Sequence, residues 1–252
     1  KNGMLKKLGD RLEEHYEDKL NIFRWLTSST ENIDYKAEKN KYNQNIQSTN
    51  AYVTDDYFCQ GKGPFYCQGK DPISKIPFGP TQLDGQPGKV EQYGCGVIAV
   101  LNANTALDDK SFDTPVDAFE YFHNQHEPYT NELLRKLGNI ETLGVSPLTI
   151  EQYYENSGYN VDSVYFSIND MDQTAANSDV SILTYAYYDT DNGKIKIDGH
   201  SVCVKPYGLN KDGEMLYYVF NNNNNTPVSD PMTLRNCIGE KSYAISLLGI
   251  NK

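Results

Sequence analysis

The spacing of apolar residues changes once along this chain, and that change sets the class of fold. Between residues 95 and 157, apolar side chains recur at helical spacing. After residue 160 the pattern becomes one of strands separated by short polar turns, such as Asp191-Asn192-Gly193. Helices come first and turn-linked strands follow, whereas a parallel sheet would need alternating strands and helices. The sequence therefore predicts an α+β fold with an antiparallel sheet.

The boundaries of the helices can be read in part from capping residues. The helix at 146–157 has the clearest start, because Ser146 can cap it, Pro147 takes its first position and Gly158 stops it. The predicted helices are 4–27, 95–103, 115–124, 130–137 and 146–157. The predicted strands are 161–168, 180–188, 194–207, 215–220 and 243–248. Both sets belong to a chain of 252 residues, which is ample to bury a core.

The first third of the chain differs from the rest in composition and in the spacing of its apolar residues. Residues 28–50 are polar without a convincing period and predict an extended connection. Residues 51–94 are rich in Gly, Pro, Gln and Lys, and a hairpin is expected around Gly61-Lys62-Gly63-Pro64. We therefore predict an N-terminal helix with a loop-rich segment over 1–84 and a main domain over 85–252. The apolar stripe of the 4–27 helix is expected to pack on that domain, with a pro-region or a partner-binding helix as the alternatives.

Charge excludes one class of partner. The chain has 23 Lys and Arg against 34 Asp and Glu, a net charge of −11. Nucleic-acid affinity rests largely on clustered Lys and Arg, so we expect no nucleic-acid partner. No apolar stretch is long enough to span a membrane, and a soluble protein is expected. No signal peptide is visible, so the compartment stays open.

Five cysteines are an odd number, so at least one thiol stays free in a monomer. Cys59 and Cys67 lie in a short echo, Cys-Gln-Gly-Lys, and can pair if the protein is secreted. As a zinc half-site this spacing is unusual, and the pair His123 and His126 lacks an obvious third ligand. No metal or other cofactor is therefore expected.

Cys95 is the cysteine best placed for chemistry. It follows Tyr93-Gly94 and opens the apolar helix predicted at 95–103. The free N–H groups and the dipole of a helix N-terminus favour a thiolate, and the same N–H groups can hold an oxyanion. The sequence thus predicts a thiol with a lowered pKa. The alternative is a buried structural cysteine.

Two residues of the predicted sheet can complete such a site. His200 follows Asp198-Gly199 and opens an apolar strand, where a rigid yet reachable base is expected. Asn221 ends the strand 215–220 and can orient the imidazole, as a nucleophilic cysteine with a histidine base requires. Asn222 is an equal candidate by position, and a polar turn is the alternative interpretation of both asparagines.

The order of these three residues, Cys on a helix, then His on a strand, then Asn after a turn, resembles that of papain-like cysteine peptidases. The strings Gln92-Tyr93-Gly94-Cys95-Gly96 and Gly199-His200-Ser201-Val202 resemble signatures of the bacteriocin-leader-processing (double-glycine) peptidase group within that superfamily. The resemblance covers roughly 85–250. It implies a helix bearing Cys95 packed on an antiparallel sheet bearing His200 and Asn221, with no cofactor and a peptide or protein substrate.

This chain departs from the pattern of that group at the glutamine that stabilises the oxyanion. Its usual position, six residues before the cysteine, holds Lys89 here. Gln92 is the preferred donor, Gln86 is the alternative, and Gln82 is discounted because it lies far upstream. The resemblance implies hydrolysis of peptide bonds through a thioester acyl-enzyme. An amidase, a transglutaminase-like acyltransferase or a deamidase would use the same triad, and a catalytically inactive binding scaffold would keep only the fold.

Overall fold

The structure, a computed structural model, describes residues 32–45, 52–54, 64–82, 85–125, 140–142, 144–191, 194–223, 226–240 and 242–252. The helices predicted at 4–27 and 130–137 lie outside these residues. So do Cys59, His126 and most of the predicted hairpin turn at 61–64. The strands on either side of that turn, β1 (Tyr52–Thr54) and β2 (Pro64–Tyr66), pair antiparallel.

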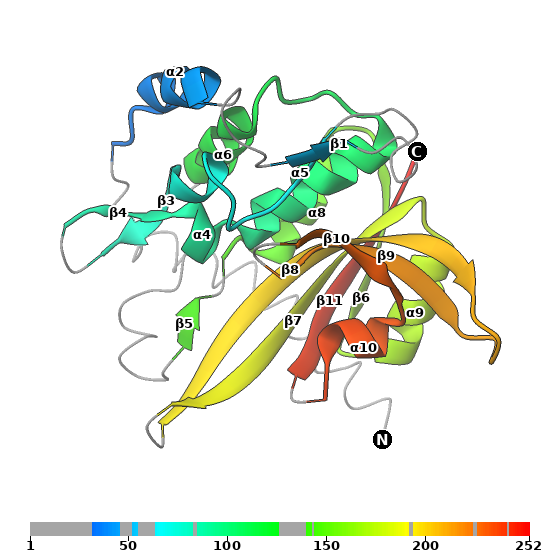
Figure 1. The fold of residues 1–252 in the computed structure, drawn as a ribbon. Helices are drawn as coiled ribbons and strands as arrows, with labels where there is room; N and C mark the ends of the chain where they lie inside the picture. Colours follow the sequence, from blue (N-terminus) through cyan, green and yellow to red (C-terminus); the bar gives the residue numbers. More distant parts are fainter. Residues whose placement is uncertain are drawn as a thin grey trace.

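The centre of the fold is a seven-stranded sheet in which six strands follow the antiparallel order β10-β9-β8-β7-β11-β6 (Figure 1). The seventh strand, β5, lies parallel to β8. The strands of this sheet are β5 (Ile140–Thr142), β6 (Asn160–Tyr165), β7 (Val180–Asp191), β8 (Lys194–Leu209), β9 (Met215–Asn223), β10 (Thr226–Met232) and β11 (Ser242–Asn251). The predicted α+β class with an antiparallel sheet is confirmed. β10, which follows the Asn run, was not predicted.

Helices cover both faces of the sheet (Figure 1). The helices on one face are α5 (Cys95–Leu107), α6 (Pro115–Asn124) and α8 (Pro147–Asn156), and the other face carries α9 (Ile168–Ala176) and α10 (Leu234–Ile238). Alternate side chains of β8 lie on opposite faces of the sheet. Cys203 packs in the core beneath α5, while Val202 and Val204 pack in the core beneath α9 and α10. The sheet thus separates two apolar cores.

The predicted helices that fall on described residues are confirmed as α5, α6 and α8. Every residue of α5 is buried, which agrees with a sequence that is apolar on most faces. The start of α8 is also as predicted, since Ser146 Oγ accepts from the Leu148 N–H at 3.3 Å and Pro147 takes the first position. Gly158, just beyond the helix, has a positive φ of 86°.

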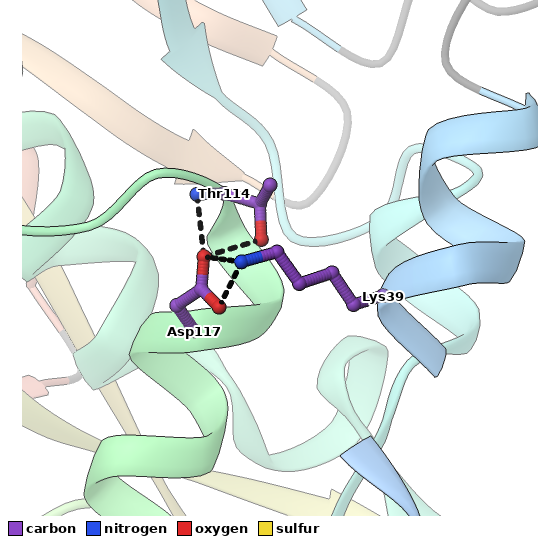
Figure 2. A network of polar contacts seen from close by, with 3 residues as sticks. All are labelled: Lys39, Thr114 and Asp117. Carbon is purple, nitrogen blue, oxygen red and sulfur yellow. Dashed lines mark hydrogen bonds and ion pairs between the residues drawn. The ribbon is translucent and has the colours of Figure 1, made fainter. Parts of the chain in front are cut away.

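The extended connection predicted at 28–50 is wrong where it is described, because α2 (Tyr35–Asn45) is a helix. Its sequence carries almost no apolar stripe, and only Tyr35 and Tyr42 are buried. Tertiary contacts hold it instead: the Tyr35 hydroxyl donates to the Pro77 carbonyl at 3.2 Å, and Lys39 forms an ion pair with Asp117 of α6 at 2.6 Å. Figure 2 shows that Asp117 also accepts from the backbone and hydroxyl of Thr114, at the N-terminus of α6.

The strand predicted at 161–168 ends earlier than expected, at Tyr165. Phe166 adopts a positive φ of 57°, which breaks the strand, and Ser167 then caps the unpredicted helix α9 by accepting from the Asp170 N–H. Further short elements absent from the prediction are η2 (Ile73–Lys75), β3 (Pro77–Thr81), β4 (Pro87–Lys89), α4 (Val90–Tyr93) and α10. Each is too brief to show a period in the sequence.

The described residues before position 85 share the core of the rest. Phe65 stacks on Phe220 of β9 with ring centroids 4.1 Å apart. Asn102 of α5 clamps β2 with two hydrogen bonds, accepting from the Tyr66 N–H at 2.7 Å and donating to the Tyr66 carbonyl at 3.1 Å. β2 is therefore fixed to both the central helix and the sheet, and the loop that follows it is brought toward the start of α5.

Candidate active site

Cys95 is the first residue of α5, at the point where α4 turns into that helix (Figure 1). The turn depends on Gly94, whose N–H donates to the Val90 carbonyl at 2.8 Å. A Cβ at position 94 would lie 2.6 Å from Val90 Cγ1, so only glycine fits there. The Cys95 side chain is only 6% exposed.

The Cys95 thiol is bound mainly by Ser201 of β8. Hydrogen bonds from the main chain and hydroxyl of Ser201 and from the Gly96 main chain favour the thiolate. Burial opposes them and is the largest effect, with Asp198 adding to it, so the pKa of the Cys95 thiol is raised above its ordinary value. The lowered pKa predicted from the helix N-terminus is therefore wrong, because the helix begins inside the protein.

Gly144 closes the space over the thiol. A methyl group at this position would lie 3.4 Å from Cys95 Sγ and equally close to the Tyr93 carbonyl. The backbone there has a positive φ of 56°, which further favours glycine. The turn that leads into α8 thus approaches the thiol along bare backbone.

His200 lies on β8 next to Ser201, and its ring is held from two sides. Its Nε2 is 2.7 Å from the Asn221 carbonyl oxygen, and the ring of Tyr185 meets it edge-on at 5.8 Å between centroids. A carbonyl can only accept, so Nε2 carries the proton and Nδ1 keeps the lone pair of a base. Burial lowers the pKa of His200, and the bond to Asn221 offsets this only in part.

Asn221 meets His200 through its main chain, whereas the sequence predicts contact through its side chain. Asn221 is fully buried with a positive φ of 61°, and its Oδ1 accepts from the Gln68 N–H at 2.9 Å. The neighbouring Asn222 side chain accepts instead from the Cys237 thiol at 3.7 Å. Of the two asparagines, Asn221 is the one that holds the imidazole.

Cys95 is linked to the strand of His200 through Ser201, the residue that follows His200 on β8. Ser201, which touches the thiol, pairs with Thr184 across the sheet, while His200 pairs with Tyr185. Because successive side chains of a strand leave opposite faces, His200 starts from the face opposite Ser201. Among the described residues, no hydrogen bond joins the Cys95 sulfur to the His200 ring. Ser201 therefore contacts the thiol, while the neighbouring His200 side chain leaves the other face of β8.

The predicted oxyanion donor, Gln92, is an exposed residue of α4. Its Oε1 accepts from the Lys89 N–H at 3.3 Å, which folds the side chain back over the start of α4. That contact does not bring its amide to Cys95. Gln86 is also exposed and lies just before β4.

A different glutamine, Gln68, lies inside the site and was not predicted. It is 3% exposed, and its Nε2 donates to the Glu91 carbonyl of α4 at 3.1 Å while its Oε1 has no partner among the described residues. The only signal in the sequence was the repeated string Cys67-Gln68-Gly69-Lys70, whose Gln side chain could not be placed without the fold. Cys67 beside it is buried with a free thiol.

Comparison with known proteins adds no assignment: neither family models nor curated proteins match the chain. Within the described ranges, no three His, Cys, Asp or Glu side chains gather as a metal site would require. In the same ranges, no helix is both long and apolar enough to cross a membrane. The site must therefore be interpreted from its own geometry.

Proposed function

We propose that the protein is a papain-like cysteine peptidase in which Cys95 attacks a peptide carbonyl. The observation that carries the proposal is the placement of Cys95 at the first position of α5, against the strand of a histidine whose tautomer leaves Nδ1 as the base. A thiol nucleophile needs such a base and an acceptor that fixes it. Here the acceptor is the Asn221 carbonyl.

The shifted pKa values favour a neutral starting pair. The pKa of the Cys95 thiol is raised and that of His200 is lowered, so thiol and imidazole are both uncharged near neutral pH. The thiol proton must then pass to His200 Nδ1 as the sulfur–carbon bond forms, which requires the imidazole to turn toward the thiol from the face opposite Ser201. The imidazolium returns this proton to the leaving amine when the peptide C–N bond breaks. Water, deprotonated by the same nitrogen, hydrolyses the thioester and releases the acid and the free thiol.

The start of α5 is the natural place for the negative charge of the tetrahedral intermediate. Main-chain N–H groups at a helix N-terminus have no partner within the helix and attract an anion. The Gly96 main chain favours the Cys95 thiolate in the same way. In this proposal the main chain supplies the oxyanion donors, and a contribution from the Gln92 amide stays a prediction.

A second candidate function is a binding scaffold without catalysis. It is favoured by the absence of a hydrogen bond between Cys95 and His200 and by the burial of the thiol. The amidase, acyltransferase and deamidase alternatives keep the same Cys-His-Asn chemistry and differ only in the acyl donor and acceptor.

Incubation with a diverse peptide mixture, read by mass spectrometry, separates these functions. We expect cleaved peptides from the wild type and a loss of about 10³-fold or more in Cys95→Ala and His200→Ala. Cys203→Ala is the matched control, since Cys203 is a buried cysteine of the sheet beneath α5. Added hydroxylamine would reveal acyl transfer as hydroxamates, and a mass gain of about 1 Da in Gln or Asn peptides would reveal deamidation. Equal product patterns from wild type and Cys95→Ala would leave only the scaffold.

A further inference from the structure

Three hydrogen bonds connect His200 to the turn that precedes Cys95. The His200 Nε2–H donates to the Asn221 carbonyl at 2.7 Å. The Asn221 side chain accepts from the Gln68 N–H at 2.9 Å, and the Gln68 Nε2–H donates to the Glu91 carbonyl at 3.1 Å. Glu91 belongs to α4, whose last turn leads through Gly94 into the helix of Cys95. Gln68 is the only member of this bridge that touches both sides.

The two side chains of the bridge are buried. Asn221 is fully buried and Gln68 nearly so, so neither side chain exchanges its partner for water. The assignment of both amides is fixed by their partners, because a carbonyl needs a donor and an N–H needs an acceptor. Asn221 also holds a left-handed backbone, which asparagine tolerates better than most residues and which turns its carbonyl toward the imidazole.

Stability alone does not account for a glutamine at position 68. Its Oε1 and the Asn221 Nδ2 are both buried without a partner among the described residues. An apolar side chain of the same length would leave no such acceptor unpaired. Buried polar groups that lower stability in this way are typical of functional sites, where the positions of side chains are held at a cost in stability.

We propose that Gln68 is a positioning residue, which sets His200 relative to Cys95 by tying Asn221 to α4. The role of the bridge in catalysis rests on the proposed function. Its effect on the His200 ring can be measured whether or not the protein is a peptidase. Gln68 touches neither the thiol nor the imidazole, and it acts on the base only through the Asn221 carbonyl.

The test compares Gln68→Met with Gln82→Met in the full chain. Methionine keeps the length of the side chain and removes both polar atoms. Gln82 is a half-buried glutamine whose Nε2 donates to the Pro80 carbonyl at 2.8 Å and to the Tyr93 hydroxyl of α4 at 3.1 Å, so it controls for the loss of a glutamine bound to α4 but not to Asn221. Nitrogen NMR of His200 gives the tautomer and the exchange rate of the Nε2 proton. Peptide mapping after iodoacetamide treatment gives the alkylation rate of Cys95.

In Gln68→Met we expect a mixed His200 tautomer, Nε2–H exchange about tenfold faster, and Cys95 alkylation about tenfold slower near neutral pH, since a misplaced catalytic group costs this much or more. Gln82→Met should match the wild type in all three. Gln68→Glu, which keeps the shape and loses the donor, is the second variant if Gln68→Met does not fold.

A folded Gln68 variant with the wild-type tautomer and exchange rate would overturn the proposal and leave Gln68 as a packing residue. A changed tautomer supports the bridge whatever the thiol does. If the tautomer changes while His200→Ala has no effect on Cys95 alkylation, the bridge stands and the peptidase function fails.

Discussion

At the scale of single residues, Asn221 carries a conformation that most side chains avoid. Its φ of 61° is left-handed, which costs a residue with a Cβ about 1 kcal/mol and costs glycine almost nothing. Both Asn221→Ala and Asn221→Gly lose the acceptor for the Gln68 N–H. We expect Asn221→Ala to be the less stable of the two by about 1 kcal/mol in the free energy of unfolding. Denaturant titration measures this, and equal values would show that the backbone is not held left-handed.

Some residues of the candidate site could be predicted from the sequence, and others could not. Cys95, His200 and Asn221 could be selected because their order along the chain is a linear feature, although His200 lies inside β8 and does not open a strand as expected. The pKa of the Cys95 thiol could not be predicted, since its sign depends on how deeply α5 begins inside the protein. Gln68 was also hidden, because the loop that holds it reaches the site only through the docking of β2 on Asn102 and Phe220.

At the scale of elements, the attachment of α2 to α6 offers a test with a pH dependence. Burial raises the pKa of Asp117, but hydrogen bonds from Lys39 and Thr114 outweigh it, so the pKa is lowered overall (Figure 2). A carboxyl with a lowered folded pKa stabilises the protein above its unfolded pKa, and this is lost as the pH falls through the folded value.

Lys39→Met should therefore lower the free energy of unfolding by about 0.5 kcal/mol at pH 7, a value reduced because the pair is partly exposed. The difference from wild type should shrink as Asp117 becomes protonated in acid. Lys41→Met is the control, since among the described residues Lys41 forms an ion pair only with Glu38 of its own helix, and the change should leave unfolding unchanged. A deficit in Lys39→Met that persists unchanged to pH 2 would show that the ion pair does not hold α2.

Helices with local signals were the predictable elements. α5 is indicated by its apolar run. α6 and α8 are indicated by a capping threonine or serine followed by Pro at the first position. α2 carries no such signal and is a helix because of tertiary contacts. α9 follows the positive φ of Phe166, which no local pattern revealed, and α10 spans only Leu234–Ile238.

At the scale of the whole molecule, the sheet is what brings the site together. β8 contacts the thiol of α5 through Ser201, carries His200, and lies beside β9, which carries Asn221 near its end. The sequence predicted the antiparallel class from the order of its elements, with helices first and then strands joined by short turns. It did not predict the order of strands, in which β11 lies between β7 and β6, because the order along the chain does not tell which strands are neighbours in the sheet.

The central claim is that His200 acts as the base for Cys95, and the pH dependence of Cys95 alkylation tests it most directly. We predict two phases in the wild type. The first follows deprotonation of His200 below its ordinary pKa, and the second follows the thiol itself above its ordinary pKa, as the directions of the two shifts require. His200→Ala should lose the first phase and keep the second. Identical profiles in wild type and His200→Ala would contradict the account.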